Sequence, residues 1–456
     1  MNDSGTTQCS LFEGLSSKRV EVQFSGQATS SDGGAVLLKG ADRVLGLIKS
    51  MSASISDRRD PTRVKHEMET LLSQRVFAVA CGYEDGNDAA RLSSDPVMKL
   101  ISGRDPSGDD LASQPTISRL ENAPRQPDLF RMGTAIIKAL VERHRRRLCG
   151  RAKKITVDLD QTVDEVHGEQ QGSLFNGHYG SYCFIPLLGA MTFNDESEQI
   201  PIAAILRPGN SPDKRGAIGV LRRLLPLLRK GFPKAQIFVR LDAGFCAPEI
   251  LEYLDSERLL YAVGYGKNSV LNLISAPLMK QVRQDSKESN KTEKRFTSTT
   301  YRARSWSKTR TVVIKAEVTR IAGREPRDNP RYVVTNIPLG PQTLYEKFYC
   351  QRGEFENRIK ELKHGLKIDR TSCWKFQANQ FRLLLTLAAY ILLQEVRFKA
   401  RFTTLAKATV SRLRLELIKV GARVTSSVRR IFIELPSAYP FQRDWLRIAS
   451  ALGALA

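Results

Sequence analysis

Apolar and polar residues alternate between residues 151 and 268 in short blocks that predict interleaved strands and helices. The blocks KITVDLDQT, SYCFIPLLGAMTF, IPIAAILRPG, AQIFVRLDAGF and LLYAVGYG are rich in β-branched and aromatic residues, which predicts five strands. RGAIGVLRRLLPLLRKG and APEILEYLDSERL repeat apolar positions every three or four residues, which predicts amphipathic helices on either side of the fourth strand.

The order of these elements, three strands, helix, strand, helix and strand, is the order of an α/β, RNase H-like fold. We assign residues 151–268 to the first part of such a core and residues 344–400, which begin with a long helix, to its second part. Between them, residues 269–343 include the polar run KQVRQDSKESNKTEKRF, which predicts a loop. The β-like runs that follow it predict a β-rich insertion.

Both ends of the chain are expected to be mainly helical and to contact DNA. Residues 1–150 form a DNA-binding or dimerisation region, in which one helical pattern stops at Gly82. The stretch DDLASQPTISRLENAP predicts a short helix capped by Asp110, a turn and a second helix that carries Arg119 outward. This pattern suits a DNA-reading helix-turn-helix or an ordinary helical hairpin. Residues 401–456 predict a basic helical region, suited to packing or to DNA contact.

The composition points to a polyanionic partner. The net charge is +23, from 71 Lys and Arg against 48 Asp and Glu, which favours nucleic acid or an anionic membrane surface. Apolar runs fall short of the roughly 18 residues that cross a bilayer. The longest of them, LLLTLAAYILL, predicts a buried helix, so we expect no membrane span. Seven scattered cysteines predict the reduced thiols of a cytoplasmic protein without structural zinc.

The stretch YCQRGEFENRIKELK carries the strongest candidate chemistry. On an α-helix, Arg352, Glu356 and Lys363 lie at about 300°, 340° and 320° from Tyr349, within one stripe roughly 60° wide. Glu356 can ligate a divalent cation, and Arg352 and Lys363 can bind phosphates. Tyr349 can stack on a base or donate a hydrogen bond. A surface ion pair would explain Arg352 and Glu356, but not the other two positions.

This spacing resembles the Tyr, Arg, Glu, Lys pattern of a large group of insertion-sequence DDE transposases, and all four positions are met. The chain further resembles the insertion-sequence 1380 family in VDLDQTV, HGEQQGS, IPLLGAM, LRPGN, RLDAGF, ENRIKELK and ANQFRLLLTLAAY. The resemblance implies a homodimer that binds double-stranded DNA, at its own inverted repeats and at a target. It also implies a cytoplasmic, nucleoid-associated enzyme.

The resemblance implies an Asp-Asp-Glu triad with two Mg²⁺, for which Mn²⁺ can substitute. The first acid belongs on the first strand, where Asp158 and Asp160 face the same side, so alternation does not choose between them. The family's first acid stands two residues before Thr or Ser, which favours Asp160, with Asp158 as a supporting metal ligand. Asp242 is the expected second acid, although it also suits a turn cap, and Glu356 the third. Arg240 is expected to contact phosphate or to pair with an acid.

The expected function is cut-and-paste transposition of an insertion sequence by metal-dependent DNA cleavage and strand transfer. A non-transposing RNase H-like nuclease would use the same acids without strand transfer, and a non-enzymatic remnant would only bind DNA. In this transposase group a tryptophan of the insertion can receive a flipped base. For Trp306, packing in the core is the favoured interpretation.

Overall fold

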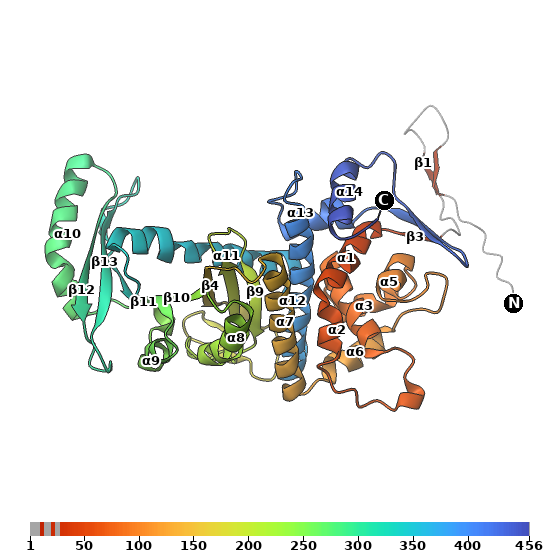
Figure 1. Cartoon of the computed structure of the whole chain (residues 1–456), viewed down its shortest axis with the longest axis horizontal. Coiled ribbons are helices and arrows are strands. Elements are labelled where there is room, and N and C mark those ends of the chain that lie inside the picture. The colour runs from red at the N-terminus through yellow and green to blue at the C-terminus, as the bar shows by residue number, and fades with distance from the viewer. Residues whose placement is uncertain (1–9, 13–19, 23–27, 456) are drawn as a thin grey trace.

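The structure, a computed structural model, describes residues 10–12, 20–22 and 28–455. Figure 1 shows an elongated molecule with a central sheet. Helices from the N-terminal part and the C-terminal elements form one end, and a strand-and-helix insertion forms the other. The fold is a mixed α/β fold, as the sequence predicts.

The central sheet has nine strands, in the order β12-β13-β15-β11-β10-β4-β8-β9, with β14 paired to β13. The five strands predicted between residues 151 and 268 are all present. β4, β8 and β9 pair antiparallel, whereas β4, β10 and β11 pair parallel. Their bounds are β4 Lys154–Gln161, β8 Leu187–Phe193, β9 Ile200–Ile205, β10 Gln236–Leu241 and β11 Leu260–Tyr265. The predicted helices are α8 (Ala217–Gly231) and α9 (Pro248–Ser256).

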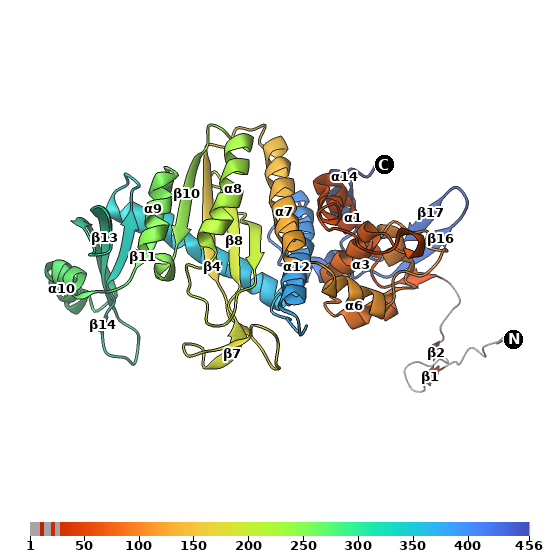
Figure 2. The same cartoon turned by 90° about the horizontal axis from the view of Figure 1, so that it is seen from below.

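One predicted strand, SYCFIPLLGAMTF, is two strands in different sheets. β8 joins the central sheet, while β7 (Ser181–Phe184) pairs with β5 (Asp164–Glu165) and β6 (Leu174–Asn176) in a separate three-stranded sheet. The division falls at Pro186, which has no N–H to continue a ladder. Figure 2 shows this small sheet projecting beyond the central sheet.

The insertion differs from its prediction in one respect. The polar run KQVRQDSKESNKTEKRF is not a loop, because it forms the second half of α10 (Ser269–Ser289) and the start of β12. Met279 and Val282 of this helix pack on β13, and apart from Val282 residues 280–289 are all polar, which hid this half of the helix in the sequence. The strands also extend the central sheet, since β15 pairs antiparallel with β11. They are β12 Glu293–Tyr301, β13 Arg310–Thr319, β14 Arg327–Asp328 and β15 Arg331–Thr335.

The N-terminal region is helical, and its helix α3 ends at Gly82 as predicted. The predicted helix-turn-helix is wrong, because α6 begins at Gln114 and no helix precedes it at residues 110–113. The side-chain amide of Gln74 donates to the carbonyl of Ala112 at 2.9 Å and accepts its N–H at 3.0 Å, which holds this segment out of a helix. The helices are α1 Val36–Leu45, α2 Leu47–Ser52, α3 Met68–Cys81, α4 Ala89–Leu92, α5 Pro96–Ile101, α6 Gln114–Asn122 and α7 Gln126–Arg147.

The long helix α12 (Phe376–Lys399) joins the two halves of the molecule. It includes the apolar run LLLTLAAYILL and is buried over most of its surface, between the central sheet and the N-terminal helices (Figure 1). Among the described residues, no helix has both the length and the apolar character needed to span a bilayer.

The C-terminal region, residues 401–456, is predicted to be helical, but the structure shows that it is not wholly so. It contains α13 (Val410–Leu413) and α14 (Gln442–Ala451), but also a hairpin of β16 (Ala422–Ser426) and β17 (Ile431–Glu434). β16 pairs with β3 (Thr29–Ser30), so the two ends of the chain share one small sheet. A short ladder between β1 (Ser10–Phe12) and β2 (Val20–Val22) precedes it.

Candidate active site

Asp158 and Asp160 lie on the same face of β4 but in different surroundings. Asp158 is fully buried and forms a bidentate ion pair with Arg240 of the adjacent strand β10, Nε to Oδ1 at 2.8 Å and Nη2 to Oδ2 at 2.7 Å. Arg240 is buried as well, and it donates to the carbonyl of Phe348 at 2.9 Å. Burial raises the pKa of Asp158, and the charge of Arg240 opposes that rise. We call this the inner pair.

The inner pair bears on two predictions. Arg240 pairs with an acid, which was one of its two expected roles, and because it is buried it presents no surface for the other role, a DNA contact. Both carboxylate oxygens of Asp158 are taken by the guanidinium, and Gln199 also donates to it at 3.3 Å. A metal ion would have to displace these donors from a site without solvent access, so this geometry disfavours the metal-ligand role of Asp158, which stays a prediction.

Asp160 forms a second Asp–Arg pair at the end of β4, which we call the outer pair. Arg352 donates through Nη1 to Oδ2 at 2.6 Å, while Oδ1 accepts the N–H of Gln161 at 2.9 Å. Burial raises the pKa of Asp160 to about 6; the charge of Arg352 opposes the rise, and the charges of Asp242 and Glu356 add to it. This carboxylate therefore lies within the field of the two other predicted acids.

Asp242 follows the last residue of β10. Because β4 and β10 run parallel and Asp158 is opposite Arg240, Asp160 and Asp242 stand two residues further along their strands, at the same edge of the sheet. The carboxylate of Asp242 also accepts the N–H of Gly244 at 3.0 Å, so it does cap the next turn. Burial raises its pKa, and the charge of Arg352 opposes that rise.

The third predicted acid is on a helical segment that is not one regular α-helix. A π-helical turn spans Thr343–Phe348, a 3₁₀ turn spans Tyr349–Arg352, α11 spans Gly353–Lys360, and a second π-helical turn spans Glu361–Gly365. The predicted stripe counts about 100° for every residue, and 3₁₀ and π turns depart from that value. The stripe is therefore only partly preserved.

Three of the four stripe residues lie beside the acids. Arg352 reaches Glu356 Oε1 at 3.7 Å in addition to Asp160, and the Glu356 side chain is 54% exposed. The Tyr349 hydroxyl lies 2.5 Å from the point where a side chain on Gly264 of β11 would begin, and the backbone of Asp242 borders the same point. Only glycine leaves room at position 264 for this tyrosine.

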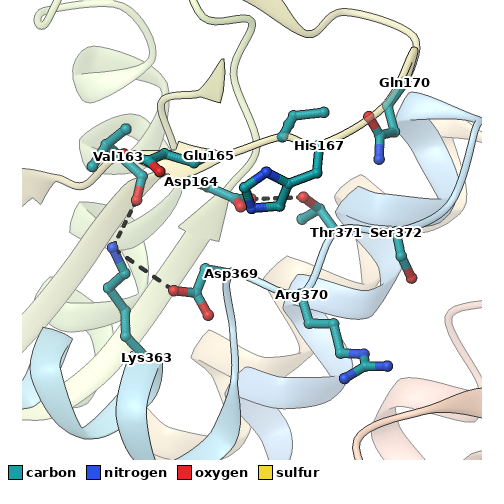
Figure 3. Close-up of a pocket in the computed structure, with 11 residues that line it drawn as sticks. Val163, Asp164, Glu165, His167, Gln170, Lys363, Asp369, Arg370, Thr371 and Ser372 are labelled. Atoms are coloured by element: carbon teal, nitrogen blue, oxygen red, sulfur yellow. Dashed lines mark hydrogen bonds and ion pairs between the residues drawn. The ribbon is translucent and has the colours of Figure 1, made fainter. Parts of the chain in front are cut away.

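Lys363, the fourth stripe residue, lies beside the segment that directly follows β4. Its Nζ donates to the carbonyl of Val163 at 2.8 Å and lies 3.8 Å from Asp369 Oδ2, as Figure 3 shows. It lines a cavity of about 440 Å³, in which buried Asp164 accepts a hydrogen bond from Thr371 Oγ1 at 2.9 Å. Burial raises the pKa of Asp164 to about 8.

Sequence comparison places the whole arrangement in a family. The chain matches the family described as Transposase DDE domain group 1 over residues 12–456, which is nearly its entire length. The chain belongs to this family of DDE transposases. Among curated proteins, none matches it. Family membership implies an enzyme that binds DNA and cuts or transfers its strands with divalent metal ions.

The three predicted acids of this transposase have the right chemical groups for a divalent cation, but in this structure they are too far apart to bind one together. Asp160, Asp242 and Glu356 offer carboxylate oxygens, the ligands that hard cations prefer. Within the described part of the chain, however, no three acidic, His or Cys side chains are close enough together to hold an ion. The guanidinium of Arg352 stands between Asp160 and Glu356.

Asp213 is an acid of the transposase site that the sequence analysis missed. Its Oδ1 accepts from Gln161 Nε2 at 2.6 Å, and its Oδ2 lies against Gly244, in the turn that Asp242 caps. Arg207 holds the loop by donating to the carbonyl of Asp213 at 2.8 Å. Asp213 comes three residues after LRPGN, one of the stretches that resemble the transposase family. This closeness was the signal in the sequence that could have identified it.

Arg119 of the transposase lies away from the acids. It is exposed on α6 and donates to Thr116 Oγ1 at 3.2 Å. Both views place α6 across α12 from β4 (Figures 1 and 2). Arg119 therefore lies apart from Asp160, the predicted first acid.

Proposed function

We propose that the protein catalyses cut-and-paste transposition of an insertion sequence, with Asp160, Asp242 and Glu356 as its catalytic acids. One observation carries the proposal. In a chain of the DDE transposase family, Asp160 and Asp242 end adjacent parallel strands, and Arg352 links Asp160 to Glu356. The strand order β9-β8-β4-β10-β11, with three antiparallel strands followed by two parallel ones, supports an RNase H-like core around them.

The acids would hold two Mg²⁺, with Mn²⁺ as substitute. When bound, two such ions activate the attacking water or 3′-hydroxyl and stabilise the leaving oxygen of a phosphodiester. The chain itself must first ionise Asp160, whose pKa is raised to about 6. Until a cation binds, Arg352 pairs with the ionised carboxylate of Asp160. Once a cation has replaced it there, the guanidinium can donate to a DNA phosphate instead.

The DNA contacts follow from the placement of the remaining polar groups. Tyr349 borders Asp242, and Lys363 lies beside the chain that follows β4; both would position the strand that is cut. Arg119, on the exposed side of α6, would contact double-stranded DNA further from the cut. A net charge of +23 supports such extended contact with the inverted repeats and target. We propose a homodimer, since two ends must be cut and joined together.

The test is cleavage and joining of a plasmid that carries the element's ends, with Mg²⁺. We expect Glu356→Gln to lose activity by on the order of a thousandfold, because a neutral amide is a poor cation ligand. Glu354→Gln is the matched control: Glu354 is exposed on the same helix and accepts a hydrogen bond from Asn357 at 3.3 Å, away from Asp160, so activity should persist. Undiminished cutting by Glu356→Gln contradicts the assignment.

Two other outcomes would favour the alternatives. Cleavage without joining to a target favours a non-transposing nuclease. Binding without cleavage by the wild-type protein favours a DNA-binding remnant. The family match supports the transposase over the nuclease, and the grouped acids support an enzyme over a DNA-binding remnant.

A further inference from the structure

Exposed aromatic side chains gather on the hairpin of β6 and β7. Phe175 and Tyr182 are directly opposite each other in its ladder, and they are 55% and 60% exposed. Their rings lie edge to face, with centroids 5.6 Å apart. At the turn of the hairpin, His178 and Tyr179 make a second edge-to-face contact at 4.8 Å. We call these four residues the aromatic hairpin.

These side chains do not stabilise a core. Within the described chain, Phe175 and Tyr182 belong to none of the hydrophobic core clusters. Exposed aromatic residues gathered at one place are unusual on a protein surface and mark interaction sites. Trp306 of the insertion is the opposite case, because it is 3% exposed and packs against Tyr265 and Tyr301. As expected, it is a core residue, and its ring is not free to stack.

The hairpin is held firmly in place. Asn176 Nδ2 donates to the carbonyl of Gly209 at 2.7 Å, and Phe184 pairs with Pro208. A side chain on Gly209 would begin 2.2 Å from the carbonyl oxygen of Leu174, so this contact requires glycine. The hairpin therefore has a fixed position on the loop that follows β9.

The same loop connects the hairpin to the acids. Arg207 donates to the carbonyls of Ile185, after β7, and of Asp213, beside Asp242. Burial raises the pKa of Tyr179, and the charges of Asp213 and Asp160 raise it further, which agrees with a tyrosine near the carboxylates. β5, the third strand of the small sheet, begins four residues after Asp160.

The chemistry of the hairpin indicates its ligand. Residues 164–184 contain no Lys or Arg, so the hairpin has no cationic grip on phosphates. Aromatic rings bind nucleic acid by stacking on base faces, which are available only where bases are unpaired. We propose that the aromatic hairpin stacks unpaired bases of the DNA next to the phosphodiester at Asp160. This inference rests on the proposed function and adds a binding site for single-stranded nucleotides to it.

The test compares the affinity of full-length protein for two labelled DNAs, by fluorescence anisotropy in EDTA. One is a duplex of about 30 base pairs with a 3′ overhang of about six thymidines, and the other is the same duplex with blunt ends. We expect Phe175→Ala/Tyr182→Ala to weaken binding of the overhang DNA at least about tenfold and to leave blunt-duplex binding unchanged. Because stacking releases few counterions, the salt dependence of binding should stay as in the wild type.

Phe402→Ala is the matched control. Phe402 is 73% exposed and follows the far end of α12, a helix of 24 residues. Such a helix is about 36 Å long, so this aromatic residue is remote from the hairpin. Its replacement should change neither affinity. The conservative double variant Phe175→Tyr/Tyr182→Phe should retain wild-type binding, because both rings remain.

A second measurement reports stacking directly. When 2-aminopurine replaces a base of the overhang, binding of the wild-type protein should change the fluorescence of the 2-aminopurine. Binding of Phe175→Ala/Tyr182→Ala should leave that fluorescence unchanged. Equal affinities of this variant and the wild type for the overhang DNA overturn the inference. An equal loss of affinity for both DNAs in this variant also overturns the inference. So does a wild-type dimer that dissociates in the variant, measured by sedimentation, because the hairpin would then form a contact between two copies of the chain. If the wild-type protein binds neither DNA, both the proposed function and this inference fail. If the wild-type protein binds both DNAs and only the effect of the hairpin variant is missing, the inference fails and the proposed function stands. The binding test is independent of cleavage because EDTA removes the metal ions.

Discussion

The two Asp–Arg pairs on β4 use the same residue types, two positions apart, on the same face of one strand. The inner pair, Asp158 with Arg240, is bidentate and closed to solvent. The outer pair, Asp160 with Arg352, has a single contact at 2.6 Å, and both of its side chains keep some exposure. The difference lies in the partner: Arg240 comes from the neighbouring strand, and Arg352 from a helical turn over the sheet edge. We therefore assign the inner pair to the framework and propose that the outer pair opens.

The largest expected effect is on catalysis by the outer pair. Asp160→Asn should reduce plasmid cleavage by a thousandfold or more, because the amide cannot replace an anionic ligand. The fold should survive, since burial already disfavours the ionised carboxylate. Urea denaturation should therefore give a free energy of unfolding no lower than that of the wild type. Cleavage by Asp160→Asn at the wild-type rate would remove the distinction between the pairs.

The inner pair should affect stability instead. Asp158→Ala leaves the buried charge of Arg240 without its partner, which should lower the free energy of unfolding by about 3–5 kcal/mol. Replacing both residues, as Asp158→Leu/Arg240→Met, should recover most of that loss, because no buried charge remains. Urea denaturation measures both. Single variants as stable as the wild type would show that the inner pair is not part of the framework.

The pH dependence of stability should reveal the outer carboxylate in metal-free protein. The pKa of Asp160 is about 6 in the fold and near 3.8 in the unfolded chain, so the folded state binds the proton more tightly. Stability should fall as pH rises from about 4 to about 6, by at most roughly 1.4 kcal/mol per pH unit. Asp160→Asn should lack this component of the slope. Identical slopes for the two proteins would contradict the raised pKa.

The smallest expected effect concerns Asp213. Its charge raises the pKa of Asp242, so Asp213→Asn should let Asp242 ionise at lower pH. The acidic limb of the cleavage-rate profile should shift towards lower pH, while the rate on its plateau stays within about tenfold of the wild type. A shift towards higher pH would mean that Asp213 acts through Gln161 rather than through Asp242.

Much of this arrangement could be predicted from local pattern. The five strands around the acids follow from apolar blocks, and the spacing of Tyr349, Arg352 and Glu356 was sufficient to group them, although the turns that carry them are irregular. Lys363 departs from the group because a π-helical turn intervenes.

The rest depends on partners that are distant in sequence. Alternation could not separate Asp158 from Asp160, because their difference comes from Arg240, more than eighty residues away. Gln74 keeps the segment before α6 out of a helix through contacts that no local pattern contains. Asp213 likewise reaches Asp242 only through the fold of its loop.

The most direct test of the central claim exchanges each aspartate of β4 for cysteine and varies the metal ion in the cleavage assay. A thiolate is a soft ligand that Mg²⁺ binds poorly and softer cations accept. If Asp160 ligates the catalytic ion, Asp160→Cys should be inactive with Mg²⁺ and should regain cleavage with Mn²⁺. Asp158→Cys should show no such dependence on the ion. Recovery by Mn²⁺ in Asp158→Cys, and not in Asp160→Cys, would contradict the assignment of the outer pair to catalysis.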